Sequence, residues 1–297
     1  MAEKPTNHHT PLHSSPFYVL GASVRDGRKR IVELADERSL VADAELCAKA
    51  RGDLTNPRNR LAAEIAWLPG LSPSAAKVLI ENLPNHAEML KRASSAPALA
   101  KANLMAAAIG FLGADTPSDE WHDWIIGFAE AVEDVDPEGV LRTVNEDRSV
   151  SGFPEVRGLE LVETELAERR RVYTETVRSA LNELPSDKLV EVVTSVVEST
   201  TDSGDEHAPA LVHDIVDRYE AEANRFLVPE AENIKKLIDA LLTDAAKGES
   251  AVRPLVGRLE SMLKRWDSVA QPIQLSKKAQ GLDHALSGEL AWGVRHL

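Results

Sequence analysis

The second half of the sequence contains three long runs of apolar residues at heptad-like spacing. The first run begins at Leu159 and is interrupted only by Arg169. The other two runs begin at Leu211 and Val252. Spacing of this kind predicts long helices that pack along one another. We therefore expect residues 156–280 to form an elongated antiparallel helical bundle of coiled-coil character.

Two polar stretches and one proline divide these runs. Residues 201–208 (TDSGDEHA) and 247–250 (KGES) are predicted to be turns between antiparallel helices. Pro229 lies inside the second run. Because proline has no backbone N–H, it predicts a kink or a short break in the helix near Leu227 and Val228.

The two ends of the chain differ from the rest. Residues 1–14 are polar, and we expect a disordered tail. The tail carries the histidines His8, His9 and His13. Without a fixed scaffold they are not expected to form a metal site. Residues 284–297 predict the start of a further helix. Because the segment ends at Leu297 without the Gly, Asn or Pro that usually ends a helix, we expect the chain to be a fragment of a longer protein.

The first half of the sequence consists of shorter periodic segments separated by prolines. Several of these prolines stand where the first turn of a helix tolerates them. Runs of β-branched residues bounded by turns are almost absent, and aromatic residues make up only 4% of the chain, so we predict an all-α fold. Residues 68–150 are grouped as a helical array. From the N-terminus, helices are expected over residues 24–38, 43–54, 58–68, 73–83, 86–94, 97–112, 117–133 and 137–146.

Charge and composition restrict the partners and the location. The formal net charge is -14, which disfavours nucleic acid and anionic membranes, because both reward Lys and Arg. Cys47 is the only cysteine. No intrachain disulfide can form, and a cytoplasmic location is expected. Cys47 itself is interpreted as a small core residue. No apolar run approaches the roughly 20 residues that cross a bilayer.

Three separated elements near the N-terminus occur in a distinctive order. PFYVLG at 16–21 is followed by the basic segment RDGRKRIVELAD at 25–36, and then by LTNPRNRLAAEI at 54–65. This order resembles the J domain of DnaJ-type co-chaperones, which has an aromatic and Leu-Gly start, a basic second helix and a Leu-Ser/Thr-x-Pro-x-x-Arg signature. The resemblance covers residues 15–67 and implies a small module of antiparallel helices. The residues that match the signature are Leu54, Thr55, Asn56, Pro57 and Arg60.

One element of the family pattern is missing. J domains carry a His-Pro-Asp tripeptide after the basic helix, whereas residues 40–43 of this chain read LVAD. The resemblance therefore implies a module that docks on a protein partner without stimulating the ATPase of an Hsp70. The residues that it implies in partner contact are Arg25, Arg28, Lys29, Arg30 and Asp43.

A second resemblance lies in residues 67–80, WLPGLSPSAAKVLI, which are similar to a helix-hairpin-helix element. In that element a glycine turn presents backbone N–H groups to a phosphate. Under this alternative the chain is a nucleic-acid-associated accessory protein. Its implied phosphate contacts are Gly70, Ser72 and Lys77, joined by Arg58, Arg60, Lys91 and Arg92. Ser72 stands where the element has a second glycine.

The segment SDEWHDWIIGF at 118–128 places His122 among acidic residues. A neighbouring carboxylate favours the protonated imidazole, so His122 is a candidate site residue. However, Trp121, Ile125 and Phe128 share one helical face. This pattern favours a core stripe over a functional site.

Sequence patterns for catalysis and cofactor binding are missing. The chain has no P-loop, dinucleotide-binding glycine pattern, hydrolase elbow, HExxH or paired CxxC. We expect no enzymatic activity, no cofactor and no metal. The predicted function is a protein-interaction or co-chaperone-like scaffold. The identity of the partner stays open, and the heptad runs allow the helices to close within one chain or on a second copy.

Overall fold

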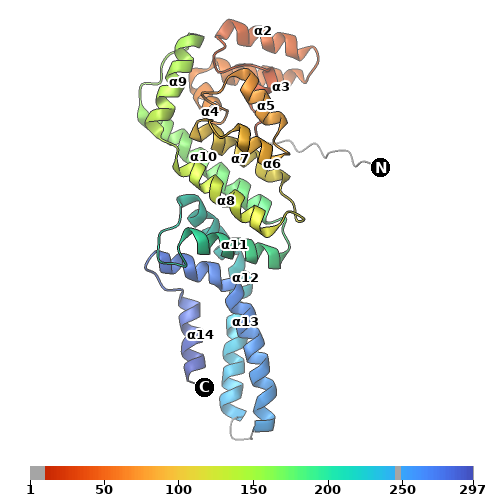
Figure 1. Cartoon of the computed structure of the whole chain (residues 1–297), viewed down its shortest axis with the longest axis vertical. Coiled ribbons are helices and arrows are strands. Elements are labelled where there is room, and N and C mark those ends of the chain that lie inside the picture. The colour runs from red at the N-terminus through yellow and green to blue at the C-terminus, as the bar shows by residue number, and fades with distance from the viewer. Residues whose placement is uncertain (1–10, 245–248, 297) are drawn as a thin grey trace, which may run out of the picture. The chain divides into compact units, whose positions relative to one another are not determined.

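The computed structural model describes residues 11–244 and 249–296 of the chain (Figure 1). Every regular element in these two ranges is a helix, which confirms the predicted all-α fold. None of the helices in the same ranges combines the length and the apolar composition that crossing a bilayer requires. Coiled-coil packing stays a prediction.

The helices follow one another along the chain with short connections, and their starts agree with the predicted segments to within a few residues in most cases. In chain order they are α1 Pro16–Leu20, α2 Arg28–Ser39, α3 Ala44–Thr55, α4 Pro57–Ile65, α5 Pro73–Glu81, α6 His86–Arg92, α7 Ala98–Ala108, the 3-10 helix η1 Ile109–Phe111, α8 Ser118–Glu133, α9 Pro137–Ser151, α10 Leu159–Leu181, α11 Ser186–Thr200, α12 Ala210–Asp244, α13 Glu249–Ala279 and α14 Ala285–Arg295.

Short polar side chains set the starts of several helices. The Asp43 carboxylate accepts hydrogen bonds from the backbone N–H groups of Glu45 and Leu46 at 2.8 and 3.1 Å. Asn56 Oδ1 accepts one from the backbone N–H of Arg58 at 3.0 Å. Each cap satisfies donors that the first turn of a helix leaves without an intrahelical partner, so α3 and α4 begin where the sequence places these residues.

The chain divides into two compact units. Unit 1 comprises residues 1–116 and 127–183, and unit 2 comprises residues 117–126 and 184–297. This division differs from the expected one, which began the long bundle at residue 156. Helix α10 belongs to unit 1, whereas α11 to α14 belong to unit 2.

The core of unit 1 explains why α10 lies there. Val162 of α10 is buried in one cluster with residues of α4, α7 and α9 and with Val156. The heptad-like spacing of α10 shows that the helix has one apolar face, but it does not show which helices cover that face. The other buried members of the cluster are Leu61, Ile65, Leu99, Val140 and Val144.

Residues 11–14 differ from the expected disordered tail. The Leu12 side chain is buried, and the ring of His13 meets that of Tyr18 edge to face at 4.8 Å between centroids. Burial of one leucine is favourable enough to hold a short polar segment against α1. Residues 1–10, which include His8 and His9, lie outside the described residues.

Two residues interpreted as core from the sequence alone are indeed buried. Cys47 lies in the interior of unit 1. The stripe of Trp121, Ile125 and Phe128 on α8 is also buried, as its spacing predicted.

Helix α12 continues through Pro229 without a break. The prediction of a short break near Leu227 and Val228 was therefore wrong, whereas a kink at Pro229 stays a prediction. Trp266 of α13 is buried, and its Nε1 donates a hydrogen bond to the carbonyl oxygen of Leu227 at 2.9 Å.

The turn predicted at 201–208 joins α11 and α12. Asp202, Ser203 and Gly204 all have positive φ, at 45°, 57° and 91°. Only glycine adopts such angles without strain, so the two preceding residues need local support. Thr201 supplies it, because its carbonyl oxygen accepts the backbone N–H of Gly204 at 3.0 Å. The other predicted turn, at 247–250, falls partly outside the described residues.

Helix α14 packs on α12 within unit 2. Lys235 Nζ donates to Glu289 Oε2 at 2.7 Å, and a Cβ added to Gly293 would lie 3.2 Å from Ile238 Cδ1. The predicted helix near the end of the chain is present and begins at Ala285.

His284 is expected to make unit 2 less stable as the pH falls. Burial lowers the pKa of this imidazole from its ordinary value near 6.5; Glu220 opposes the shift and Lys277 adds to it. The ring stacks on Trp266 at 5.9 Å between centroids. The unfolded chain then takes up the proton more readily than the folded one, so the stabilisation is complete above pH 6.5 and is lost as the pH falls below it.

The measurement is urea unfolding of the wild type and of His284→Gln at pH 7.5 and pH 5.5. The wild type should lose more free energy of unfolding between the two pH values than the variant does. Since the other histidines are present in both proteins, the difference isolates His284. Equal losses would contradict the assignment.

Candidate interaction site

Helices α2 and α3 form a hairpin whose loop is apolar and exposed. Leu40 is 84% exposed and Val41 is 78% exposed, and Leu46 in the first turn of α3 is also exposed. We call these three residues the apolar tip. Four residues, 40–43, join the two helices (Figure 1). The tip occupies the place where the J-domain resemblance has its tripeptide.

Asp43 ends the same loop, and its carboxylate is used locally. It caps α3 by accepting hydrogen bonds from the backbone N–H groups of Glu45 and Leu46. The sequence interpretation assigned Asp43 to partner contact. The geometry shows a positioning role, because the cap fixes where the loop ends and α3 begins. Contact of Asp43 with a partner stays a prediction.

The basic residues around the start of α2 do not form one free surface. Arg25 Nε donates to Asp147 Oδ1 of α9 at 2.8 Å, and the Arg28 Cζ atom lies 5.4 Å from the centroid of the Phe153 ring. Both arginines are thus partly engaged within unit 1. The hydrogen bond with Asp147 raises the pKa of Arg25 further above its ordinary value.

Lys29 and Arg30 are the more accessible part of the basic segment. Lys29 has 94% of its side chain exposed. Arg30 forms surface ion pairs with Glu33 and Glu37 at 3.4 and 3.3 Å, and these raise its pKa. Exposed pairs of this kind are weak and exchange easily for those of a partner.

A buried ion-pair cluster lies behind the hairpin and is formed by Arg60, Glu64 and Arg148. Arg60 Nε donates to Glu64 Oε1 at 2.6 Å, and Arg148 Nε donates to Glu64 Oε2 at 2.9 Å. All three side chains are buried. Burial raises the pKa of Glu64, although the guanidiniums of Arg148 and Arg60 act in the opposite direction. Burial also lowers the pKa of Arg60.

The remaining donors of the two arginines reach backbone carbonyls. The Arg60 Cζ atom also lies 3.9 Å from the centroid of the Phe153 ring, in cation–π geometry. The cluster therefore joins residues 15–67 to α9 and to the loop that follows it, so the J-like segment is not set apart from the rest of unit 1. The carbonyl acceptors are Val24 at 2.6 Å and Leu54 at 3.4 Å for Arg60, and Pro57 and Pro154, both at 3.1 Å, for Arg148.

The sequence interpretation missed this cluster. Arg60 was assigned to the J-domain signature and, in the alternative, to phosphate contact. Its burial rules out phosphate contact in the folded chain. Arg148 lies 84 residues from Glu64. No local pattern links the two, although the i to i+4 spacing of Arg60 and Glu64 could have indicated an ion pair on one helix.

The turn at Gly70 is exposed, and one side of it packs against Pro97. Gly70 has φ of +77°, and an added Cβ would lie 2.9 Å from Pro97 Cγ. Ser72 Oγ accepts the backbone N–H of Ala75 at 3.2 Å and caps α5. Lys77 is exposed, with its Nζ 3.9 Å from a Glu81 oxygen. These contacts favour a structural turn over a phosphate site.

The other basic residues of the phosphate alternative do not add to that turn as a group. Arg92 Nε donates to Glu88 Oε1 at 2.6 Å on α6. Arg58 and Lys91 are exposed, on α4 and α6 respectively. With Arg60 buried, the set predicted from the sequence is reduced to separate surface charges.

The structure brings His122 into a line of hydrogen bonds with Ser199 and Asp123. His122 Nε2 lies 2.8 Å from Ser199 Oγ, and Nδ1 lies 2.9 Å from Asp123 Oδ1. The order of groups is that of a nucleophile, a base and an orienting carboxylate. The surroundings do not suit that chemistry, because Ser199 lies in the last turn of α11, where the helix dipole is negative and disfavours an oxyanion. The Asp123 side chain is also 82% exposed.

No group of three or more His, Cys, Asp or Glu side chains within the described ranges is arranged to hold a metal ion.

The comparisons with known proteins do not identify a function, so the functional assignment rests on the geometry described above. No protein-family model matches the chain, and no curated protein and no solved structure matches it either.

Proposed function

We propose that this chain is a non-enzymatic protein-interaction or co-chaperone-like scaffold that docks on a protein partner through the α2–α3 hairpin. The observation that carries the proposal is the apolar tip. Leu40 and Val41 are neighbours in a short loop and are among the most exposed apolar residues of the described chain. Scattered exposed apolar residues are common, but adjacent ones at the end of a hairpin favour a contact site.

The accessible charges at the start of α2, which lie at the other end of this helix from the tip and roughly 15 Å along it, fit an acidic partner surface. Lys29 and Arg30 project from α2, and their present partners are exposed carboxylates on the same helix. A partner that buries the tip would gain about 1.5–3 kcal/mol for each large apolar side chain. The basic side chains would then contribute mainly to orientation and to the rate of association.

The proposal predicts that the chain does not stimulate an Hsp70. The J-domain resemblance lacks its tripeptide, and the loop that replaces it offers apolar side chains and no histidine. ATP turnover by a bacterial Hsp70 should stay at its basal rate when the chain is added at saturating concentration, while a complete J domain in a parallel reaction stimulates it. A clear increase with this chain would overturn the non-stimulating part of the proposal.

The docking surface is tested by Leu40→Asp combined with Val41→Asp. Both side chains are exposed, so the variant should fold like the wild type. It should lose at least tenfold in affinity for the protein that the wild type retains from extracts of the native cell. Leu161→Asp is the matched control, since Leu161 is an exposed apolar residue of the same unit. Equal retention by all three proteins would exclude the tip as the docking site.

A further inference from the structure

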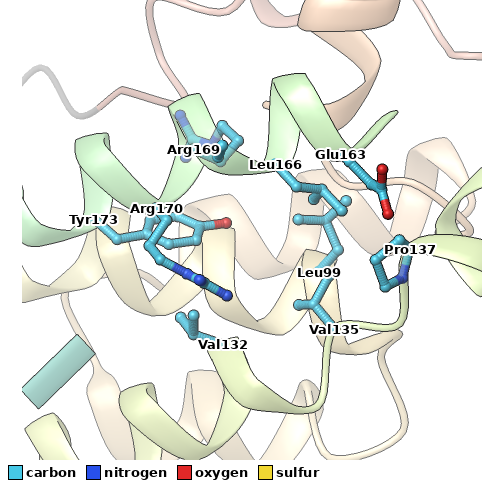
Figure 2. Close-up of a pocket in the computed structure, with 10 residues that line it drawn as sticks. Leu99, Val132, Val135, Pro137, Glu163, Leu166, Arg169, Arg170 and Tyr173 are labelled. Carbon is cyan, nitrogen blue, oxygen red and sulfur yellow. The ribbon is translucent and has the colours of Figure 1, made fainter. Parts of the chain in front are cut away.

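Unit 1 contains a pocket of about 170 Å³ that the docking surface does not use. Its wall is mostly aliphatic: Leu99 comes from α7, Val132 from α8, and Leu166 from α10. Val135, between α8 and α9, and Pro137, the first residue of α9, complete this side. Figure 2 shows these side chains around the cavity, with the residues of α10 along one edge.

The size of the pocket limits what it can hold. Drug-sized ligands occupy pockets of roughly 300–1,000 Å³, whereas an apolar cavity of about 150 Å³ accepts a molecule such as benzene. The pocket in unit 1 is close to the second case. It therefore suits a ligand of about eight non-hydrogen atoms.

Three charged side chains of α10 line the pocket, and two of them, Glu163 and Arg170, lie at different positions along the helix. Glu163 and Arg170 are seven residues apart in the sequence, which corresponds to roughly 10 Å along a helix. Figure 2 shows the Arg170 side chain extending toward Val132, and Glu163 next to Pro137. In the part of the chain that the structure describes, neither side chain forms an ion pair or a side-chain hydrogen bond.

The neighbouring Arg169 and Tyr173 are engaged and hold this wall in place. Arg169 Nη2 and Tyr173 Oη both donate to Asn103 Oδ1 at 2.7 Å. Asn103 Nδ2 donates in turn to the carbonyl oxygens of Ile65 and Trp67 at 2.9 and 2.6 Å. Because these polar groups satisfy one another, Arg170 is the cation at the pocket that is free to bind a ligand.

We propose that the pocket binds a small apolar monocarboxylate, such as a linear acid of about six carbons. The Arg170 guanidinium would accept the carboxylate in the paired hydrogen-bond geometry that arginine favours. The alkyl chain lies against Leu99, Val132 and Leu166. Glu163 repels the carboxylate, so the ligand has one orientation, with its charged end at Arg170.

The test is a calorimetric titration of the full chain with hexanoate, and with hexanol as the uncharged comparison. Hexanoate should bind at least tenfold more tightly than hexanol. Arg170→Gln should reduce the affinity for hexanoate about tenfold or more. Arg171→Gln is the matched control, because Arg171 is exposed, pairs with Glu168, and does not line the pocket. It should bind hexanoate like the wild type.

A charge reversal provides an independent readout. Arg170→Glu should lose hexanoate and gain binding of hexylammonium, since the pocket would then carry two carboxylates. The proposal is overturned if hexanoate and hexanol bind equally, or if Arg170→Gln and Arg171→Gln behave alike. The same carboxylate chemistry occurs at the end of a peptide, so an acetylated tripeptide ending in leucine is titrated in parallel. Tighter binding of that peptide would identify a chain terminus as the source of the carboxylate.

Discussion

Replacing Glu64 by alanine is expected to lower the free energy of unfolding by about 3–5 kcal/mol, because it leaves two buried arginines without their counterion. Glu64 receives hydrogen bonds from Arg60 at 2.6 Å and from Arg148 at 2.9 Å, and all three side chains are buried. Whole proteins are stable by only about 5–15 kcal/mol. The variant should therefore lose a large part of its free energy of unfolding. This free energy is measured by urea unfolding followed by circular dichroism.

The control is an exposed ion pair in the same unit. Glu37 lies 3.3 Å from Arg30 on the surface of α2, and Glu37→Ala should cost less than about 1 kcal/mol. Glu64→Gln keeps the shape and part of the hydrogen bonding, so its loss should fall between the two. If Glu64→Ala and Glu37→Ala prove equally mild, the buried cluster does not stabilise unit 1.

The J-like segment is expected not to fold when it is cut out of the chain. A peptide of residues 11–67 loses Arg148, Asp147 and Phe153. Glu64 then keeps only one counterion, Arg25 loses its carboxylate, and Arg60 loses the ring beside it. A chain this short is marginally stable even with a complete core. We expect no cooperative thermal transition and little helix signal in circular dichroism.

The full chain is the reference for this experiment, and its helix signal should melt cooperatively. A second reference is residues 11–67 titrated with trifluoroethanol, which shows the helix signal available to that length of chain. A cooperative transition of the isolated peptide in buffer would show that residues 15–67 form an independent module, as the sequence resemblance implied.

The location of the candidate site was predictable, but its usable residues were not. Residues 40–43 follow a basic amphipathic segment and end in a capping aspartate, so a loop between two helices could be expected there. The contacts that Arg25 and Arg28 make within unit 1 could not be predicted. Their partners, Asp147 and Phe153, come from a part of the sequence more than 100 positions away.

Local sequence patterns were enough to predict the helices and most of their starts. Apolar spacing, prolines in first turns and capping residues such as Asp43 act within a few positions of the chain, and local hydrogen bonds and sterics suffice to produce them. The same local logic made the burial of Trp121 predictable.

Which helix faces contact each other depends on how the whole unit packs. It placed α10 in unit 1, carried α12 through Pro229, and joined Arg148 to Glu64. An apolar stripe predicts that one face of a helix is buried. It does not predict which element packs on that face, because burial is favourable against any apolar surface of suitable shape. A buried charge is more selective, since it requires one particular counterion at hydrogen-bond distance, and that requirement is met only once the whole unit has packed.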